Sequence, residues 1–419
     1  MANRHHRPQT AMLKRGAITA VAGLALAAAP AGAAAAFEEC VADLREELIQ
    51  EGQPADVVET ALTDVRRLDR LIELDRHQPE FVQHFWDYID QRVTDRRVAQ
   101  GRRLMEKHSE LLWRIRGDYG ISPRYLVALW GMETHYGSYF GRVPVVDALV
   151  TLSCDGRRGA FFRTQLEATI EILSANRMKR ADMRGSWAGA MGHTQFMPTT
   201  FLDYAIDYDG SGSTDLWGSL ADAFGSSANY LRSMGWNPEQ RWGREVSLTD
   251  EFDYSLAGLD HRRSVREWAR AGVRRADGGH LPRSDQEGSV LLPMGRDGPA
   301  FLVYNNFRVL LRWNASVSYA LAVGHLADRL DGHPPLRGGR PEADSILNRQ
   351  ETKWVQKQLN RLGYDAGEPD GLIGPNTRRA ARAYQTDYSL PADGYPDREL
   401  MRQMKRQLVA HDEHDSGES

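Results

Sequence analysis

The sequence predicts a mainly α-helical protein of the α+β type, with a small β-containing insertion and a separate C-terminal helical unit. Three observations support this. Apolar residues recur at helical spacing in residues 37–130 and 309–330. Short apolar runs bounded by Gly, Asp and Pro lie between residues 240 and 305, which is typical of strands. A Pro/Gly/Arg-rich segment, 331–345, then precedes the last part of the chain.

Length and composition narrow the class of protein. The 419 residues suggest two or three domains, and 41% hydrophobic with 26% charged residues is typical of a soluble globular chain. The formal net charge of -4 provides no basic field for a nucleic acid, so we expect no nucleic-acid partner. Two cysteines are too few for a disulfide framework or a four-cysteine zinc site.

Residues 1–36 are predicted to be a secretory signal peptide. A basic start precedes the short apolar stretch 18–29 and the ending Ala34-Ala35-Ala36, which predicts cleavage between Ala36 and Phe37. A retained membrane anchor is the alternative, but a span needs about 20 strongly apolar residues. No cysteine directly follows the cleavage site, so we expect a periplasmic protein that is not a lipoprotein.

The two cysteines leave two possibilities open. In an oxidising compartment Cys40 and Cys154 could form a disulfide. Alternatively, they are two separate small apolar residues. The sequence does not decide between these.

Within residues 37–330, helical signals come first. Apolar positions recur at helical spacing from Leu44 to Val65 and continue past Trp113 to a stop at Tyr119-Gly120. Ser122-Pro123 then predicts a new helix, with Pro at its first position. Ser289–Pro293 and Phe301–Tyr304 are predicted strands, and helical periodicity returns from Val309 to Leu330.

The C-terminal unit is predicted to hold three short helices in residues 346–409. Trp354, Val355, Leu359 and Leu362 form one helical stripe, and Asp370-Gly371 and Asp393-Gly394 mark turns. The preceding 331–345 segment is predicted to be a flexible linker, and residues 410–419 a frayed polar tail.

Glu133 is the candidate catalytic acid. Leu126, Leu129, Trp130 and Glu133 fall at i, i+3, i+4 and i+7, so the carboxylate lies in line with an apolar stripe in the last turn of a helix. Apolar surroundings and a helix C-terminus both raise a carboxyl pKa, and a general acid must stay protonated. The alternative is a carboxylate at the rim of the stripe, paired with Arg or Lys.

Residues 185–198 have the composition of a sugar-binding loop. Gly185, Gly189 and Gly192 permit close backbone approach, Ser186 and Gln195 offer hydrogen bonds, and Trp187 and Phe196 offer flat apolar faces. The alternative is a tightly packed helix pair that uses small residues. This segment by itself does not distinguish the two.

Together these motifs give a specific resemblance. Residues 37–330 resemble the lytic murein transglycosylase B family, through Trp130-Gly-Met-Glu-Thr-His-Tyr-Gly around Glu133 and the Gln-Phe-Met-Pro motif in Ser186–Thr200. Further signatures are Ala228-Asn-Tyr-Leu, Tyr304-Asn-Asn-Phe and Arg312-Trp-Asn-Ala-Ser. The resemblance implies a lysozyme-like helical core with an α-rich flanking part and a small β-containing part.

The resemblance also implies a reaction. It implies cleavage of the β-1,4 bond between N-acetylmuramic acid and N-acetylglucosamine of peptidoglycan, with a 1,6-anhydromuramoyl product, no required cofactor and Glu133 as single acid/base. Hydrolases of such bonds normally use two carboxylates. Asp147 and Asp155 are the nearest candidates for a second one and are expected to be structural. Positions matching the family's substrate contacts are Tyr88, Ser186, Gln195, Phe196, Tyr230 and Tyr304; each tyrosine could instead be a core aromatic.

A possible calcium loop lies at Asp207–Asp215. Asp207, Asp209, Ser211 and Asp215 fall at relative positions 1, 3, 5 and 9 of an EF-hand-like loop, but position 12 is Gly218. Asp222 is the nearest later acid, although Ser219-Leu-Ala-Asp222 also matches a capping box. A solvated turn is the favoured interpretation, with weak calcium binding as the alternative.

Residues 352–408 resemble the three-helix peptidoglycan-binding domain of cell-wall enzymes, through Asp370-Gly-Leu-Ile-Gly-Pro-Asn-Thr-Arg and Ala383-Tyr-Gln. This implies binding to peptidoglycan strands, with binding to another protein, such as a second cell-wall enzyme, as the alternative. We expect a monomer. The alternatives to a lytic transglycosylase are a muramidase that hydrolyses the same bond and a non-catalytic wall-binding protein.

Overall fold

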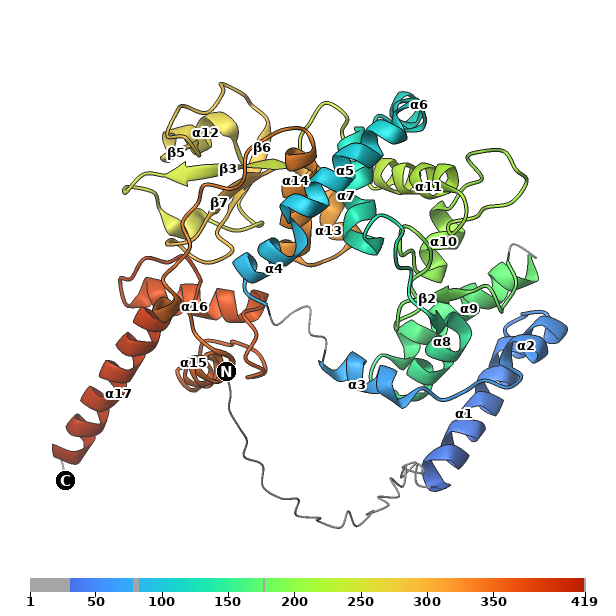
Figure 1. The fold of residues 1–419 in the computed structure, drawn as a ribbon. Coiled ribbons are helices and arrows are strands. Elements are labelled where there is room, and N and C mark those ends of the chain that lie inside the picture. The colour runs from blue at the N-terminus through green and yellow to red at the C-terminus, as the bar shows by residue number, and fades with distance from the viewer. Residues whose placement is uncertain (1–30, 78–82, 176–177, 418–419) are drawn as a thin grey trace, which may run out of the picture.

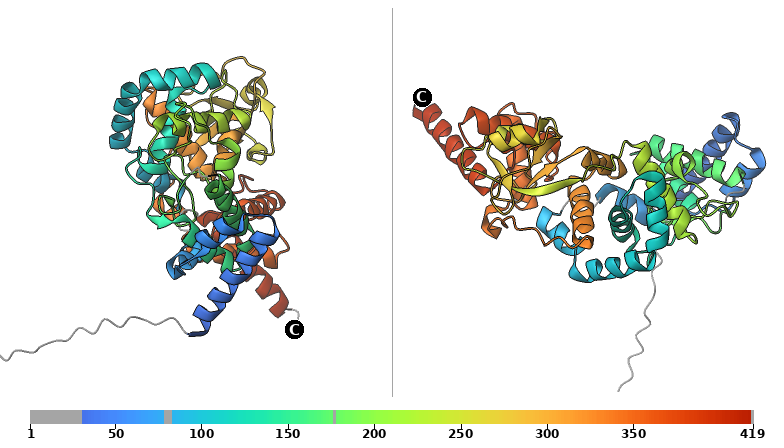
Figure 2. Two further views of the ribbon diagram at one scale, coloured as in Figure 1. Left: turned by 90° about the vertical axis from the view of Figure 1, so that its right-hand side faces the viewer. Right: turned by 90° about the horizontal axis from the view of Figure 1, so that it is seen from above.

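A computed structural model describes residues 31–77, 83–175 and 178–417, and it is mainly helical, as predicted (Figure 1). An α-helical lobe and the C-terminal unit lie at opposite ends of a central helical core (Figure 2). Residues 1–30 of the predicted signal peptide lie outside the described residues, and 31–36 form the start of helix α1 (Ala31–Gln50). Across the described ranges, every helix is too short or too polar to cross a membrane.

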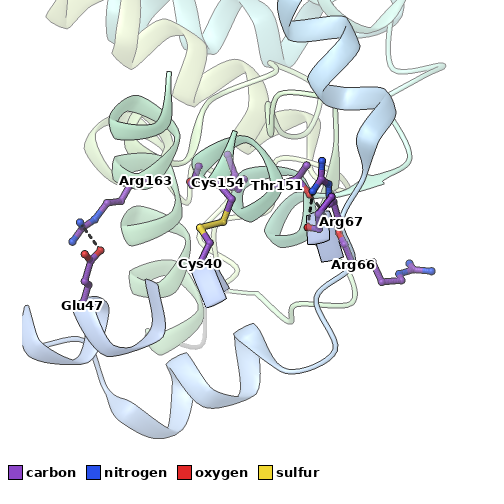
Figure 3. Close-up of a disulfide and its surroundings, with 10 residues drawn as sticks. Cys40, Glu47, Arg66, Arg67, Thr151, Cys154 and Arg163 are labelled. Carbon is purple, nitrogen blue, oxygen red and sulfur yellow. Dashed lines mark hydrogen bonds and ion pairs between the residues drawn. A yellow bond between two sulfur atoms is a disulfide. The ribbon is translucent and has the colours of Figure 1, made fainter. Parts of the chain in front are cut away.

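The α-helical lobe combines the first helices with three from the middle of the chain. These are α1, α2 (Ala55–Leu62), α3 (Asp69–His77), α8 (Val145–Cys154), α9 (Gly159–Ser174) and α10 (Pro198–Tyr204). A disulfide between Cys40 of α1 and Cys154 of α8 ties the two segments together, with the Cα atoms 6.0 Å apart (Figure 3). Of the two possibilities that the sequence left open, the structure therefore has the disulfide and not two separate cysteines.

The central core surrounds the helix that carries Glu133. Its helices are α4 (Phe85–Arg92), α5 (Asp95–Lys107), α6 (Ser109–Tyr119), α7 (Pro123–Thr134), α11 (Leu220–Ser233), α13 (Asn305–Trp313) and α14 (Val317–Leu330). Helix α6 ends at Tyr119 and is capped by Gly120, which has a left-handed φ of 74°, and α7 begins at Pro123, as predicted. Helices α4, α5 and α13 all pack against α14, and α5 and α14 also pack against α7.

The continuous helical periodicity predicted for 309–330 is interrupted in the structure. Helix α13 ends at Trp313, and α14 begins at Val317. Asn314 is extended, and the Ser316 hydroxyl accepts the backbone N–H of Tyr319 at 3.3 Å, which caps α14. The prediction missed this break because apolar spacing continues across it.

The β-containing part is an antiparallel sheet of order β4-β6-β7-β3-β5 with its own core. The strands are β3 (Gly243–Leu248), β4 (Arg263–Ser264), β5 (Val273–Arg275), β6 (Glu287–Leu291) and β7 (Ala300–Val303), with α12 (Val265–Arg270) and η2 (Tyr254–Leu256) between them. Strands β6 and β7 correspond to the two predicted strands. A second, two-stranded pairing of β1 (Val143–Pro144) with β2 (Arg184–Gly185) was not predicted.

The C-terminal unit has the expected three helices, α15 (Arg349–Arg361), α16 (Pro375–Asp387) and α17 (Arg398–Gly417), around a separate core that includes Val355, Leu359 and Tyr384. Helix α17 continues to Gly417, whereas the sequence predicted a frayed tail from residue 410. The segment has no Pro or internal Gly before Gly417, so nothing local ends the helix earlier.

The linker that was predicted to be flexible is bound to the rest of the protein. The Glu245 carboxylate accepts the backbone N–H groups of Arg337 and Gly338, at 2.8 and 2.5 Å. Arg340 of the linker forms an ion pair with Asp90 of α4 at 2.7 Å. The only regular element of the linker, all of which is described, is the short 3-10 helix η3 (Ala343–Ser345). Composition predicted mobility, but these tertiary contacts hold the linker in place.

The C-terminal unit also docks directly on the sheet. The half-buried side chain of Arg378 donates to the backbone oxygens of Leu292 and Pro293, at 3.1 and 2.6 Å. The Asp393 carboxylate accepts the backbone N–H of Arg296 at 2.9 Å. The unit therefore has its own core but a defined position beside the β6–β7 connection.

Candidate active site

Glu133 is the penultimate residue of α7 and is enclosed by side chains from α13 and α14. Trp313 donates from Nε1 to Glu133 Oε1 at 2.8 Å, and the Tyr319 hydroxyl donates to the same oxygen. Burial raises the pKa of Glu133 above its ordinary value, although these two donors and the charge of Arg92 act in the opposite direction. Glu133 is thus a partly buried acid and forms no ion pair with Arg or Lys in the described residues.

The chain reverses sharply directly after Glu133. His135, Tyr136 and Gly137 have left-handed φ values of 48°, 60° and 75°. This conformation costs energy for the two residues with side chains, so the surroundings must hold it. The Tyr136 hydroxyl donates to the Arg97 carbonyl at 2.9 Å, and its ring lies against Gly131, where a Cβ would come within 2.6 Å of Tyr136 Cε1.

An aromatic cluster backs the carboxyl group. The Trp313 ring lies 5.3 Å from that of Phe196 and 5.2 Å from that of Tyr230, measured between centroids. The Tyr230 hydroxyl donates to the Arg312 carbonyl at 2.9 Å, which fixes the residue before Trp313. Phe196 and Tyr230, both chosen from the sequence, are therefore brought to Glu133 through Trp313.

The glycine-rich loop is tied to the segment that follows Glu133. Gln195 has a left-handed φ of 50°, and its side-chain nitrogen donates to the carbonyls of Gly192 and Phe140, at 2.9 and 3.2 Å. The Ser186 Oγ accepts two backbone N–H groups, those of Ala188 and Ala190. Because both are donors to Oγ, the hydroxyl proton of Ser186 is not used in these two hydrogen bonds.

The remaining sequence-predicted tyrosines lie in different surroundings. Tyr88, on α4, is buried, and it is among the groups that raise the pKa of Tyr319, so it lies near one of the donors to Glu133. Tyr304 is 1% exposed in the core of the sheet, and the guanidinium group of Arg244 lies 5.8 Å from its ring. Its described contacts lie with the sheet and not with Glu133.

Sequence reasoning did not select Trp313 or Tyr319, whose side chains donate hydrogen bonds to Glu133. Trp313 lies in the quoted Arg312-Trp-Asn-Ala-Ser segment, which was a detectable signal. For Tyr319, the only signal in the sequence was a single hydroxyl group in an otherwise largely apolar helical stretch. Asp147 is bound by Arg180 at 3.2 Å, and Asp155 by Arg76 at 2.8 Å, so each is occupied in an ion pair.

The acidic loop differs in detail from the predicted ligand set. Carboxylate oxygens of Asp207, Asp209 and Asp222 lie within 4.8 Å of one another. Asp215, predicted as a ligand, instead accepts the N–H groups of Trp217 and Gly218 within its own turn. Asp222 is buried and accepts N–H groups of the loop, while Ser219 caps α11 as predicted.

The donor set of this loop partly fits a hard cation. Oxygen ligands that include three carboxylates suit calcium. The carboxylate oxygens of Asp207, Asp209 and Asp222 already accept hydrogen bonds from within the protein, and Gly218 supplies no side-chain ligand at position 12. Asp222 would take the place of that late ligand.

A partly buried carboxylic acid with a raised pKa is typical of enzymes that cleave glycosidic bonds. The transglycosylase SLT domain family matches residues 36–328, and a peptidoglycan binding domain family matches residues 348–404. The chain belongs to the transglycosylase SLT family and is a lytic transglycosylase of peptidoglycan.

Individual relatives agree with this assignment. The chain is 30% identical over 278 residues to the membrane-bound lytic murein transglycosylase B of Escherichia coli K12, covering 63% of this chain and 75% of the relative. The crystal structure of SltB3 from Pseudomonas aeruginosa with NAG-anhNAM-pentapeptide is 43% identical, with a TM-score of 0.83, over 88% of this chain and 99% of that one. Slt35 of E. coli in complex with calcium is 27% identical, with a TM-score of 0.62, over 70% and 92% of the two chains.

Proposed function

We propose that Glu133 is the single acid/base with which this enzyme cleaves the β-1,4 bond between N-acetylmuramic acid and N-acetylglucosamine. The observation that carries the proposal is the enclosed carboxyl group with a raised pKa, because an acid must hold its proton near neutral pH to protonate a leaving oxygen. Trp313 and Tyr319 both donate to Oε1. Oε2 is therefore the oxygen that carries the proton to the substrate.

The proposed reaction has two proton transfers at that group. Glu133 protonates the glycosidic oxygen, the bond from that oxygen to C1 of the muramoyl sugar breaks, and the donors on Oε1 stabilise the carboxylate that forms. The carboxylate then takes the proton of the sugar's own C6 hydroxyl, and O6 bonds to C1. The product carries a 1,6-anhydro ring, and Glu133 is again protonated. The arginine pairing of Asp147 and Asp155 supports a route without a second carboxylate.

The substitution Glu133→Gln tests the role of this residue. The amide keeps the size of the side chain but has no proton to donate, so turnover on peptidoglycan should fall by at least about 100-fold. Circular dichroism and binding to insoluble peptidoglycan should be unchanged. Near-normal turnover with an intact fold would refute the assignment.

Mass spectrometry of the released fragments separates the proposed reaction from its rival. A lytic transglycosylase yields a non-reducing anhydro end, lighter by one water than the reducing end made by a muramidase. Reduction with borohydride should leave the proposed product unchanged. A reducing end would favour the muramidase instead.

We propose that the C-terminal unit holds the enzyme on peptidoglycan, supported by the family match at residues 348–404. A chain ending at residue 345 should bind sacculi more weakly and still cleave short soluble glycans.

We also propose a periplasmic location. The Cys40–Cys154 disulfide supports an oxidising compartment, and it uses the sulfur that a lipid anchor on Cys40 would need.

We propose weak calcium binding at the Asp207–Asp222 loop, supported by its three converging carboxylates and by the calcium complex of Slt35. The ion would neutralise the loop's charge and would take no part in the proton transfers. Adding calcium should raise the thermal unfolding temperature over an EDTA control, and Asp209→Asn should abolish the increase. Equal unfolding temperatures with calcium and with EDTA would contradict this.

A further inference from the structure

Tyr139 is the most exposed large hydrophobic side chain in the described residues, at 59%. The other exposed aromatic residues are covered on one side. The Arg116 guanidinium lies 4.6 Å from the Trp113 ring, Phe161 packs against Phe162, and Tyr388 packs against Tyr384. Within the described part of the chain, Tyr139 has no ring, cation or side-chain hydrogen-bond partner of this kind.

The backbone that carries Tyr139 is nevertheless tightly held. Its N–H donates to the Thr134 carbonyl at 3.2 Å, directly after Glu133. The next residue, Phe140, packs its ring 4.6 Å from that of His193, and its carbonyl accepts the Gln195 side chain. Segments carrying the candidate acid and the glycine-rich loop thus both fix the position of Tyr139.

The segment that carries Tyr139 also contacts the glycine-rich loop at Gly141. A Cβ at Gly141 would lie 1.9 Å from the Gly185 carbonyl oxygen, so the backbones of these two segments touch directly before Ser186. The binding of a ligand that covers the exposed face of such an aromatic side chain is favourable, because apolar surface is removed from water. The apolar C–H face of a pyranose ring provides that cover, while its hydroxyl and acetamido groups bind polar neighbours.

We propose that Tyr139 is a stacking platform for an N-acetylated amino-sugar ring of the glycan strand next to the bond that is cleaved. This inference rests on the proposed function of Glu133, because the same strand occupies both. Tyr139 supplies binding and position, and it takes no part in proton transfer. It would help to decide which sugar ring is seated beside the acid.

The test measures binding of a peptide-free peptidoglycan tetrasaccharide to the full chain by calorimetry, in a Glu133→Gln background that prevents cleavage. Tyr139→Ala should weaken binding about tenfold. Tyr139→Phe, which keeps the ring, should remain within about twofold, as should the exposed control Trp113→Ala. Unchanged binding by Tyr139→Ala would overturn the proposal. An equal loss in Tyr139→Phe would also overturn it, because the hydroxyl and not the ring would then be the contact.

Kinetics on otherwise wild-type protein give a second readout. Tyr139→Ala should raise KM about tenfold with kcat within about twofold, because stacking contributes to binding and not to the proton transfers. A loss confined to kcat would contradict a binding role. If Glu133→Gln kept its turnover, the proposed function would fail, whereas the KM of Tyr139→Ala on otherwise wild-type protein would still test the stacking role.

Discussion

Replacing Cys40 and Cys154 together by alanine should destabilise the α-helical lobe by about 4.7 kcal/mol. The two cysteines are 114 residues apart. A crosslink that closes a loop of about 100 residues lowers the entropy of the unfolded chain, which raises the free energy of unfolding by about 4.7 kcal/mol at 25 °C. The folded lobe should keep its structure, because Leu44 and Leu48 of α1 remain buried against it. The effect thus arises mainly in the unfolded state.

Urea unfolding followed by far-ultraviolet circular dichroism measures this loss. The oxidised wild type is compared with the double variant and with wild type kept in a phosphine reductant, and the last two should unfold at the same urea concentration. The double variant avoids a free thiol that could form intermolecular disulfides. A difference below about 1 kcal/mol between oxidised and reduced wild type would show that the crosslink does not act through loop closure.

Three further changes probe the site and its supports. Tyr319→Phe removes a donor to the Glu133 carboxylate, so the pKa of Glu133 should rise and the alkaline limb of the kcat/KM profile should move to higher pH; an unmoved or lowered limb would contradict this. Asp222→Ala leaves loop N–H groups unpaired and should cost about 2 to 3 kcal/mol in urea unfolding, whereas a cost near zero would mean that water replaces the carboxylate. Arg378→Ala removes the docking bonds to residues 292–293 and should make the linker more sensitive to limited proteolysis; an unchanged cleavage rate would show that other contacts suffice.

Local signals predicted much of the fold correctly. Gly120 and Pro123 mark the boundary before α7 because a left-handed residue ends one helix and a proline begins the next. Helical spacing also placed Glu133 among apolar neighbours. The same spacing failed at 314–316, since hydrophobic periodicity does not register a cap hydrogen bond that interrupts a helix.

The site itself was only partly visible in the sequence. Phe196 and Tyr230 were predicted as substrate contacts, and the structure places both against Trp313, the residue that joins them to Glu133 and that was not selected. Composition also suggested a mobile linker at 331–345. Proline, glycine and arginine predict irregular backbone, but they do not reveal that Glu245 and Asp90 bind it.

The sequence by itself determined the family, many of the helical segments, strands β6 and β7, and the acid on an apolar helix face, because these signals depend on neighbours a few residues apart. Tertiary structure alone decided that Cys40 and Cys154 pair, that Asp222 rather than Asp215 completes the acidic cluster, and that two donors converge on one oxygen of Glu133. Each of these joins groups whose separation depends on how whole helices pack. The pKa of a carboxyl group follows from that packing, since burial and hydrogen bonding act through space and not along the chain.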